Sequence, residues 1–174
     1  MYTMNFMKIR EKIDEYFEGN YVQKKIAYLL LKYGLKISGN KIYCGPIEQS
    51  SSKLARAISI DYRIVTDTIK KINEDPELKK VFSSIEPTPN FKNTAQLFGW
   101  GILEIMPENS HLPGIFAGVA KIIADERISI RQAIGEDYEL TEDPKLIIVT
   151  EEPIPGKLIT KIKQVPGVKA ITIY

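Results

Sequence analysis

The 174-residue sequence contains one cysteine, Cys44, and one histidine, His111. A single thiol excludes an internal disulfide, and one thiol with one imidazole gives too few ligands for a structural zinc site. A nucleophilic Cys–His pair would require these two residues to meet across two domains. We therefore expect neither a metal centre nor catalysis by a thiol.

Common enzyme motifs and long apolar runs are also missing. The chain has no glycine-rich phosphate loop followed by Lys-Ser/Thr, no Gly-Xaa-Gly-Xaa-Xaa-Gly and no Gly-Xaa-Ser-Xaa-Gly. Lys or Glu interrupts every apolar run before the roughly 18 residues that a membrane span needs, and no charged leader precedes such a run. Hydrophobic residues are 44% and charged residues 26% of the chain, as in globular proteins. We expect a cytoplasmic protein that is not an enzyme.

Charge is distributed unevenly along the chain. Residues 1–89 contain 15 Lys and Arg against 11 Asp and Glu, whereas residues 90–174 contain 9 against 11. Two prolines in the segment 86–94 remove backbone donors and disfavour helix in the residues before them, and the apolar periodicity changes there from helical to strand-like. We expect a helical domain over 1–89, a linker at 86–94 and a second domain over 95–174. The small basic excess of the first domain permits DNA binding without requiring it.

Two helices and a hairpin are predicted at the start of the first domain. Apolar residues at steps of three and four from Phe6 to Phe17 predict an amphipathic helix. Asn20 and Gln23 have the spacing of a capping box at the start of a second helix, which ends at Gly34. The segment 35–44 has two β-prone runs around Gly-Asn, a pattern typical of a hairpin.

Residues 50–72 carry the most specific pattern of the first domain. A serine cap predicts a short helix with Ala55 inward, and Ile60 follows as an apolar plug in a tight turn. Asp61 then caps a longer helix. Its apolar face is predicted to comprise Ile64, Val65, Ile69 and Ile72. Two helices in so short a span cross steeply, and the small Ala55 lets them approach, as a DNA-binding helix-turn-helix requires.

The outer side of this helix pair presents hydrogen-bonding and cationic side chains suited to base edges and phosphates. The predicted DNA-binding residues are Lys53, Arg56, Tyr62, Arg63, Thr66, Lys70 and Lys71.

The same block resembles the helix-turn-helix of prokaryotic winged-helix regulators. Leu54-Ala55 matches their Leu-Ala pair, and the stretch 66–72 matches the end of their recognition helix. It departs from their pattern at Ser59, where the turn usually has Gly, and at Asp67, which places a carboxylate near the presumed DNA face. A wing normally follows the recognition helix, whereas residues 73–84 predict a further helix. Alternatively, the two helices only pack in a small helical domain or form a protein interface.

The second domain shows the order strand, helix, strand, strand, helix, strand. The predicted elements are 98–106, 113–124, 128–135, 145–151, 155–165 and 168–174. This βαββαβ order predicts an α+β fold with an antiparallel four-stranded sheet and both helices on one face, the ferredoxin-like arrangement. Trp100 is predicted within the first strand, as a core or dimer-interface residue. The acidic run 136–143 is predicted to be a solvated loop.

The loop between the first strand and the first helix contains Leu112-Pro113-Gly114-Ile115. Gly114 lets a ligand approach the backbone, and the free N–H groups of the helix start favour a carboxylate. With this Pro-Gly loop and Val165-Pro166-Gly167-Val168 before the last strand, residues 97–174 resemble the ACT family of amino-acid-sensing regulatory modules. That family often has Asp before the Pro-Gly and Asn on its second strand, where this chain has His111-Leu112 and Ser129.

The ACT resemblance implies a homodimer in which a small ligand, commonly an amino acid, binds between this loop and the second strand of the partner domain. The implied ligand contacts are Asn109, His111, Leu112, Pro113, Gly114, Ile115, Ile128, Ser129, Ile130 and Arg131.

A helix-turn-helix module followed by an ACT-like module resembles a group of archaeal proteins described as predicted regulators of amino-acid metabolism. The resemblance implies an amino-acid-responsive transcriptional regulator without a cofactor, which acts as a homodimer or higher homo-oligomer on double-stranded DNA and contacts no membrane. Its half-sites would lie about 34 to 36 Å apart, and effector and operator would affect each other's binding reciprocally.

Two alternatives stay open. In one, the chain is a regulatory subunit that senses an amino acid and docks on a biosynthetic enzyme without touching DNA. In the other, the ACT-like half is a dimerisation module with no ligand.

Overall fold

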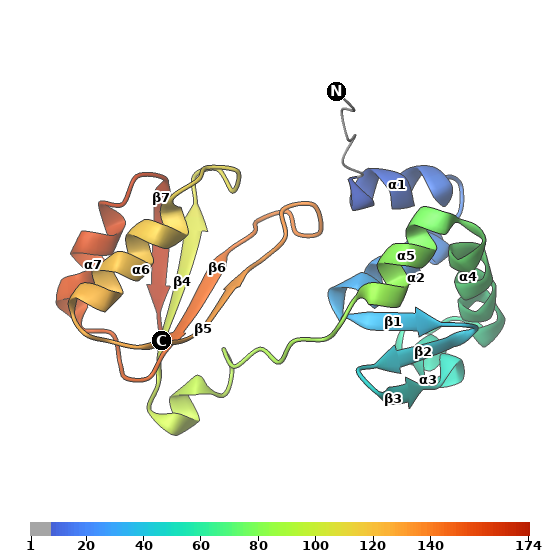
Figure 1. Ribbon diagram of the computed structural model, residues 1–174, viewed down its shortest axis with the longest axis horizontal. Coiled ribbons are helices and arrows are strands. Elements are labelled where there is room, and N and C mark those ends of the chain that lie inside the picture. Colours follow the sequence, from blue (N-terminus) through green and yellow to red (C-terminus); the bar gives the residue numbers. More distant parts are fainter. Residues whose placement is uncertain (1–7) are drawn as a thin grey trace. The chain divides into compact units, whose positions relative to one another are not determined.

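The computed structural model describes residues 8–174, and the chain divides into one compact unit that ends at Thr88 and a second, Pro89–Tyr174 (Figure 1). Helices and two antiparallel sheets make this an α+β protein, as predicted. No helix of the described residues has the length and apolar character that crossing a membrane requires.

The first unit combines five helices with a small sheet among the described residues. Its elements are α1 (Ile9–Tyr16), α2 (Tyr21–Lys32), β1 (Leu35–Ser38), β2 (Lys41–Cys44), β3 (Ile47–Gln49), α3 (Ser51–Ala57), α4 (Tyr62–Glu74) and α5 (Pro76–Ser84). Phe6, predicted in the first helix, lies outside the described residues.

Of two local predictions for this unit, the hairpin over 35–44 is confirmed by the pairing of β1 with β2, and the capping box is wrong. Asn20 makes no side-chain bond to the start of α2, and Gln23 Oε1 instead accepts a hydrogen bond of 2.8 Å from Lys71 Nζ of α4. The predicted hairpin is extended by β3, which pairs with β2 so that Ile47 faces Cys44. Gly45 reverses the chain between them with a φ of 57°, a conformation that costs glycine little.

A single apolar core holds the helices of the first unit together. Phe17 of the α1–α2 connection and Phe82 of α5 are its largest buried side chains. From α4 it receives Val65, Ile69 and Ile72, all fully buried, whereas Ile64 is half-buried at its edge. The periodicity therefore identified the buried side of α4, and with it the side that faces solvent.

The second unit contains the predicted order of strands and helices. Its elements are the 3₁₀ helix η1 (Ala95–Phe98), β4 (Gly101–Pro107), α6 (Ile115–Asp125), β5 (Ile130–Gly135), β6 (Leu146–Thr150), α7 (Gly156–Lys163) and β7 (Val168–Ile173). The strands form one antiparallel sheet in the order β5-β6-β4-β7. Both helices cover one face of it (Figure 1). Ile159 of α7 is 38% exposed, although it follows the buried Leu158.

The segment that leads into the sheet covers part of its other face. Phe91 and Trp100 pack with the buried Ala95, Ile102 and Val149. The first strand therefore begins later than predicted: Phe98 ends η1, and Trp100 precedes β4. Left-handed Gly99, with φ at 69°, turns the chain from η1 into the strand.

A buried carboxylate lies on this covered face. Glu104 of β4 is 3% exposed, and its oxygens form ion pairs with Lys92 and, at 3.3 Å, with Lys145. Burial acts to raise the pKa of Glu104, but hydrogen bonds from the two lysines outweigh it and hold the pKa below its ordinary value. The carboxylate is thus charged at neutral pH and depends on both cations.

Candidate functional site

The tight turn between α3 and α4 is the first candidate feature. The Ile60 N–H donates to the Ala55 carbonyl at 3.0 Å, which closes the turn over the buried Ala55. Asp61 caps α4 by accepting from the Arg63 N–H at 2.8 Å, whereas Ser50 at the start of α3 makes no such bond. Ser59, between the two helices, is left-handed with a φ of 58°.

Replacement of Ser59 by glycine is expected to stabilise the first unit. A left-handed φ costs an L-residue about 1 kcal/mol that glycine does not lose, so Ser59→Gly should raise the free energy of unfolding by about 0.5–1 kcal/mol. Ser52→Gly, in the regular helix α3, is the matched control and should destabilise instead. Chemical denaturation followed by far-UV circular dichroism tests the pair, and two changes of the same sign would contradict the strain at Ser59.

Five of the seven predicted DNA-binding residues are exposed. They are Lys53, Arg56, Tyr62, Arg63 and Lys70. Arg56 of α3 and Tyr62 of α4 both line a surface hollow of about 490 Å³ at the turn. Lys53 and Arg56 form no ion pair with the described part of the chain. Both side chains are therefore available to bind phosphate groups of DNA.

The two remaining predicted residues are held by neighbours. Thr66 is half-buried and its hydroxyl donates to the Tyr62 carbonyl at 3.2 Å. Lys71 reaches Gln23 of α2 at 2.8 Å and is half-buried. The prediction that Lys71 contacts DNA missed this partner, because Gln23 precedes Lys71 by 48 positions.

Acidic side chains neutralise much of the exposed face of α4. The Arg63 guanidinium donates two hydrogen bonds to Asp61, of 3.0 and 2.8 Å, and this contact lowers the pKa of Asp61 to about 2. Lys70 lies 3.9 Å from Asp67. With the exposed Glu74, the outer face of this helix presents both signs of charge at steps of three and four.

The predicted ligand loop between β4 and α6 is exposed and tightly turned. The Asn109 side chain accepts from the His111 N–H at 2.9 Å, which fixes the start of the loop. Gly114 is the N-cap of α6 with a φ of 94°, and nothing lies within 4 Å of the position a Cβ would take. The helix therefore begins at Ile115, two residues later than predicted, and Pro113 precedes its first turn.

The other half of the predicted contact set lies at the opposite end of the sheet. β4 and β5 both run antiparallel to β6, so the end of β4 lies near the end of β5, and residues 128–131 lie at the start of β5. Ile128 is buried in the core, and the Ser129 carbonyl accepts from the Glu151 N–H at 3.0 Å. Arg131 stacks on Trp100, with its guanidinium 4.0 Å from the ring centroid. One chain does not bring the two halves together.

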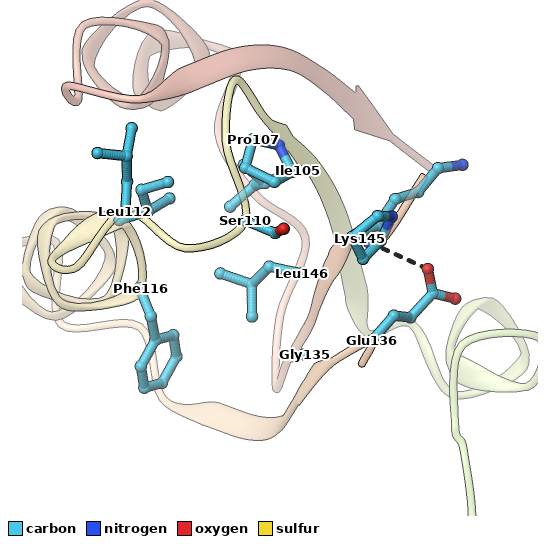
Figure 2. A pocket seen from close by; sticks show the side chains of 11 residues that line it. Ile105, Pro107, Ser110, Leu112, Phe116, Gly135, Glu136, Lys145 and Leu146 are labelled. Atoms are coloured by element: carbon cyan, nitrogen blue, oxygen red, sulfur yellow. Dashed lines mark hydrogen bonds between the residues drawn. The ribbon is translucent and has the colours of Figure 1, made fainter. Parts of the chain in front are cut away.

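Instead, the loop forms a cavity of about 160 Å³ with the hairpin between β5 and β6 (Figure 2). One wall consists of Ile105, Pro107, Ser110, Leu112, Ile115 and Phe116. The facing wall consists of Gly135, Glu136, Pro144, Lys145 and Leu146. Only Leu112 and Ile115 belong to the predicted contacts. The second wall was not predicted, because residues 135 and 146 become neighbours only through strand register.

The described residues place no group of three or more His, Cys, Asp or Glu where it could hold a metal ion. His111 instead packs its ring against Tyr138 of the β5–β6 hairpin, with centroids 4.1 Å apart.

Among the comparisons with known proteins, solved structures match this chain, whereas no family model and no curated protein does. Among solved structures, it is similar to one described as the crystal structure of PH0061, with 12% identity, a TM-score of 0.28 and coverage of 88% of this chain and 89% of that chain. It is also similar to the transcriptional regulatory protein PF0864 from Pyrococcus furiosus, a member of the AsnC family, with 11% identity, a TM-score of 0.25 and coverage of 98% and 88%. TM-scores this low do not establish a shared fold or function.

Proposed function

We propose that the chain is a transcriptional regulator that binds double-stranded DNA through α3 and α4 and responds to a small effector, an amino acid, bound by its second unit. The observation that carries the proposal is the exposed turn between the two helices. Arg56 of α3 and Tyr62, the first residue of α4, line one surface hollow there. Helix-turn-helix proteins contact base edges with the first residues of the second helix.

The sensing role is supported by the loop 109–114 and its position in the sheet. Its backbone is open at Gly114, and it ends at a helix start, where N–H groups favour an anionic ligand. Since residues 128–131 lie at the far end of the same sheet, a ligand touching both segments would need a second copy of the chain. We therefore propose an ACT-like homodimer, in which effector and operator affect each other's binding by the same factor.

DNA binding is tested by selecting a site from random double-stranded DNA and measuring affinity by fluorescence anisotropy over a range of salt concentrations. Arg63→Ala and Lys70→Ala should each weaken binding and reduce the salt slope by about one. Lys79→Ala, on the exposed side of α5, is the matched control and should leave both unchanged. If Arg63→Ala and Lys70→Ala behave like this control, α4 is not the recognition helix.

The mixed charge on α4 favours one alternative, a regulatory subunit that docks on a biosynthetic enzyme. Asp67 and Glu74 would repel phosphates but suit a protein partner with patches of both signs. Asp67→Asn separates the two functions, because it should strengthen DNA binding by a regulator. A docking subunit would show no DNA affinity in either form.

A further inference from the structure

The cavity between the β4–α6 loop and the β5–β6 hairpin has an apolar interior. Its volume of about 160 Å³ is comparable to the roughly 150 Å³ of an apolar cavity that binds benzene. Two of its polar lining residues direct their polar groups elsewhere: Lys145 Nζ pairs with Glu104, and the Glu136 carboxylate accepts from the Lys145 N–H at 3.0 Å (Figure 2). Only the Ser110 hydroxyl has no hydrogen bond within the described residues.

Large apolar side chains stay exposed around this cavity. Leu112 is 44% and Phe116 49% exposed, both on the loop side. On the hairpin side Tyr138 is exposed too, and its ring contact with His111 joins the two loops that supply the walls. Exposed apolar groups concentrated around one opening are typical of a binding site.

A second, polar cavity adjoins the first. It has a volume of about 360 Å³ and shares Pro107, Ser110 and Pro144 with the apolar cavity. The charged residues lining it are Glu108, Glu142, Asp143 and Lys169. None of these four forms an ion pair with the described residues. Three acids against one base give this cavity a negative potential, which favours a cationic group over an anionic one.

We propose that the two cavities together bind a small primary amine, its compact apolar group in the first and its ammonium in the second. The amine is either a simple monoamine or an α-amino acid with an apolar side chain, whose carboxylate would accept a hydrogen bond from the Lys169 ammonium. The site is complete within one chain, unlike the two-chain contact set above. The inference deepens the proposed sensing role and rests on that role only in taking a small molecule as the ligand of the second unit.

The test is titration of the full chain, labelled at Ile and Leu methyl groups, with three probes: 3-methylbutylamine, L-leucine and 4-methylpentanoate. The first two carry an ammonium and should shift the methyl signals of Leu112, Ile115 and Leu146. 4-Methylpentanoate lacks the ammonium and should bind about tenfold more weakly, since it cannot form the charge-assisted hydrogen bonds. Binding of L-leucine alone would identify the source as an amino acid, and binding of the monoamine alone as an amine.

Two variants with matched controls locate the ligand. Gly135 pairs with Leu146 across the sheet, so a side chain at 135 would lie on the cavity side, and nothing stands within 4 Å of its Cβ position. Gly135→Leu should therefore fill the cavity and abolish binding, whereas Gly156→Leu, equally unobstructed at the start of α7, should not. The double variant Glu142→Gln/Asp143→Asn should weaken amine binding about fivefold, and Glu152→Gln should not.

The proposal is overturned if none of the probes binds at millimolar concentration, if 4-methylpentanoate binds as well as the amine, or if Gly135→Leu binds like the native chain. Unfolding followed by Trp100 fluorescence verifies that each variant is folded. The titration contains no DNA, so a chain that binds amines but no DNA refutes only the regulator. A chain that binds DNA but none of the probes refutes only the amine site.

Discussion

Gly34→Ala is expected to destabilise the first unit by about 2–4 kcal/mol. Gly34 ends α2 with a φ of 60°, a conformation that costs an L-residue about 1 kcal/mol. A Cβ there would lie 2.5 Å from the Glu86 carbonyl oxygen and 2.6 Å from the Pro87 Cα. Both atoms are backbone, so the segment leaving the unit would have to move away from α2.

Gly39→Ala is the matched control, because it isolates the backbone strain from the steric clash. Its φ of 57° is nearly the same, but nothing lies within 4 Å of the Cβ position. We expect a loss of only about 1 kcal/mol. Hydrogen exchange of the α2 amides measures both effects. Trp100, the single tryptophan, lies in the second unit and should report no change. Equal losses for the two variants would show that the 86–87 segment does not restrict Gly34.

The double variant Lys92→Met/Lys145→Met is expected to destabilise the second unit by about 3–5 kcal/mol at neutral pH, the cost of leaving a buried charge without partners. Glu104 would keep its place in the middle of β4 but lose both ion pairs. Denaturation followed by Trp100 fluorescence measures this unit selectively. Adding Glu104→Leu should restore most of the lost stability, since an apolar side chain needs no cation there. Failure of that rescue would mean that the lysines act through packing.

The stability of the native chain and that of the Lys92→Met/Lys145→Met variant should change with pH in opposite directions. In the native chain the pKa of Glu104 is lowered, so its contribution to stability is present above the ordinary carboxyl pKa and is lost as the pH falls through the folded value. Without the two lysines, burial alone would raise this pKa, and the unit would become relatively more stable as the pH falls. Parallel pH profiles for the native and double-variant chains would contradict the assigned partners.

The sequence by itself determined most of the elements and the buried side of α4. Apolar residues at helical spacing identified the inward face of α4, and the Pro76 start of α5 and the capping role of Asp61 depend on neighbours within three residues. The βαββαβ order of the second unit likewise followed from local changes of period. Each of these features depends on residues close together in the chain, so a short stretch of sequence is enough to predict it.

The tertiary structure decided which side chains meet. In the folded chain Lys71 donates a hydrogen bond to Gln23, and Lys92 and Lys145 form ion pairs with the buried Glu104. Gly135 and Leu146 line one cavity together with Leu112 of the β4–α6 loop. The tertiary structure also placed residues 128–131 at the far end of the sheet from that loop. Each of these contacts joins positions far apart in the chain. Its geometry depends on strand register and helix packing, which local periodicity does not predict. The candidate ligand cavity, unlike the helices and strands that build it, is therefore a property of the folded chain.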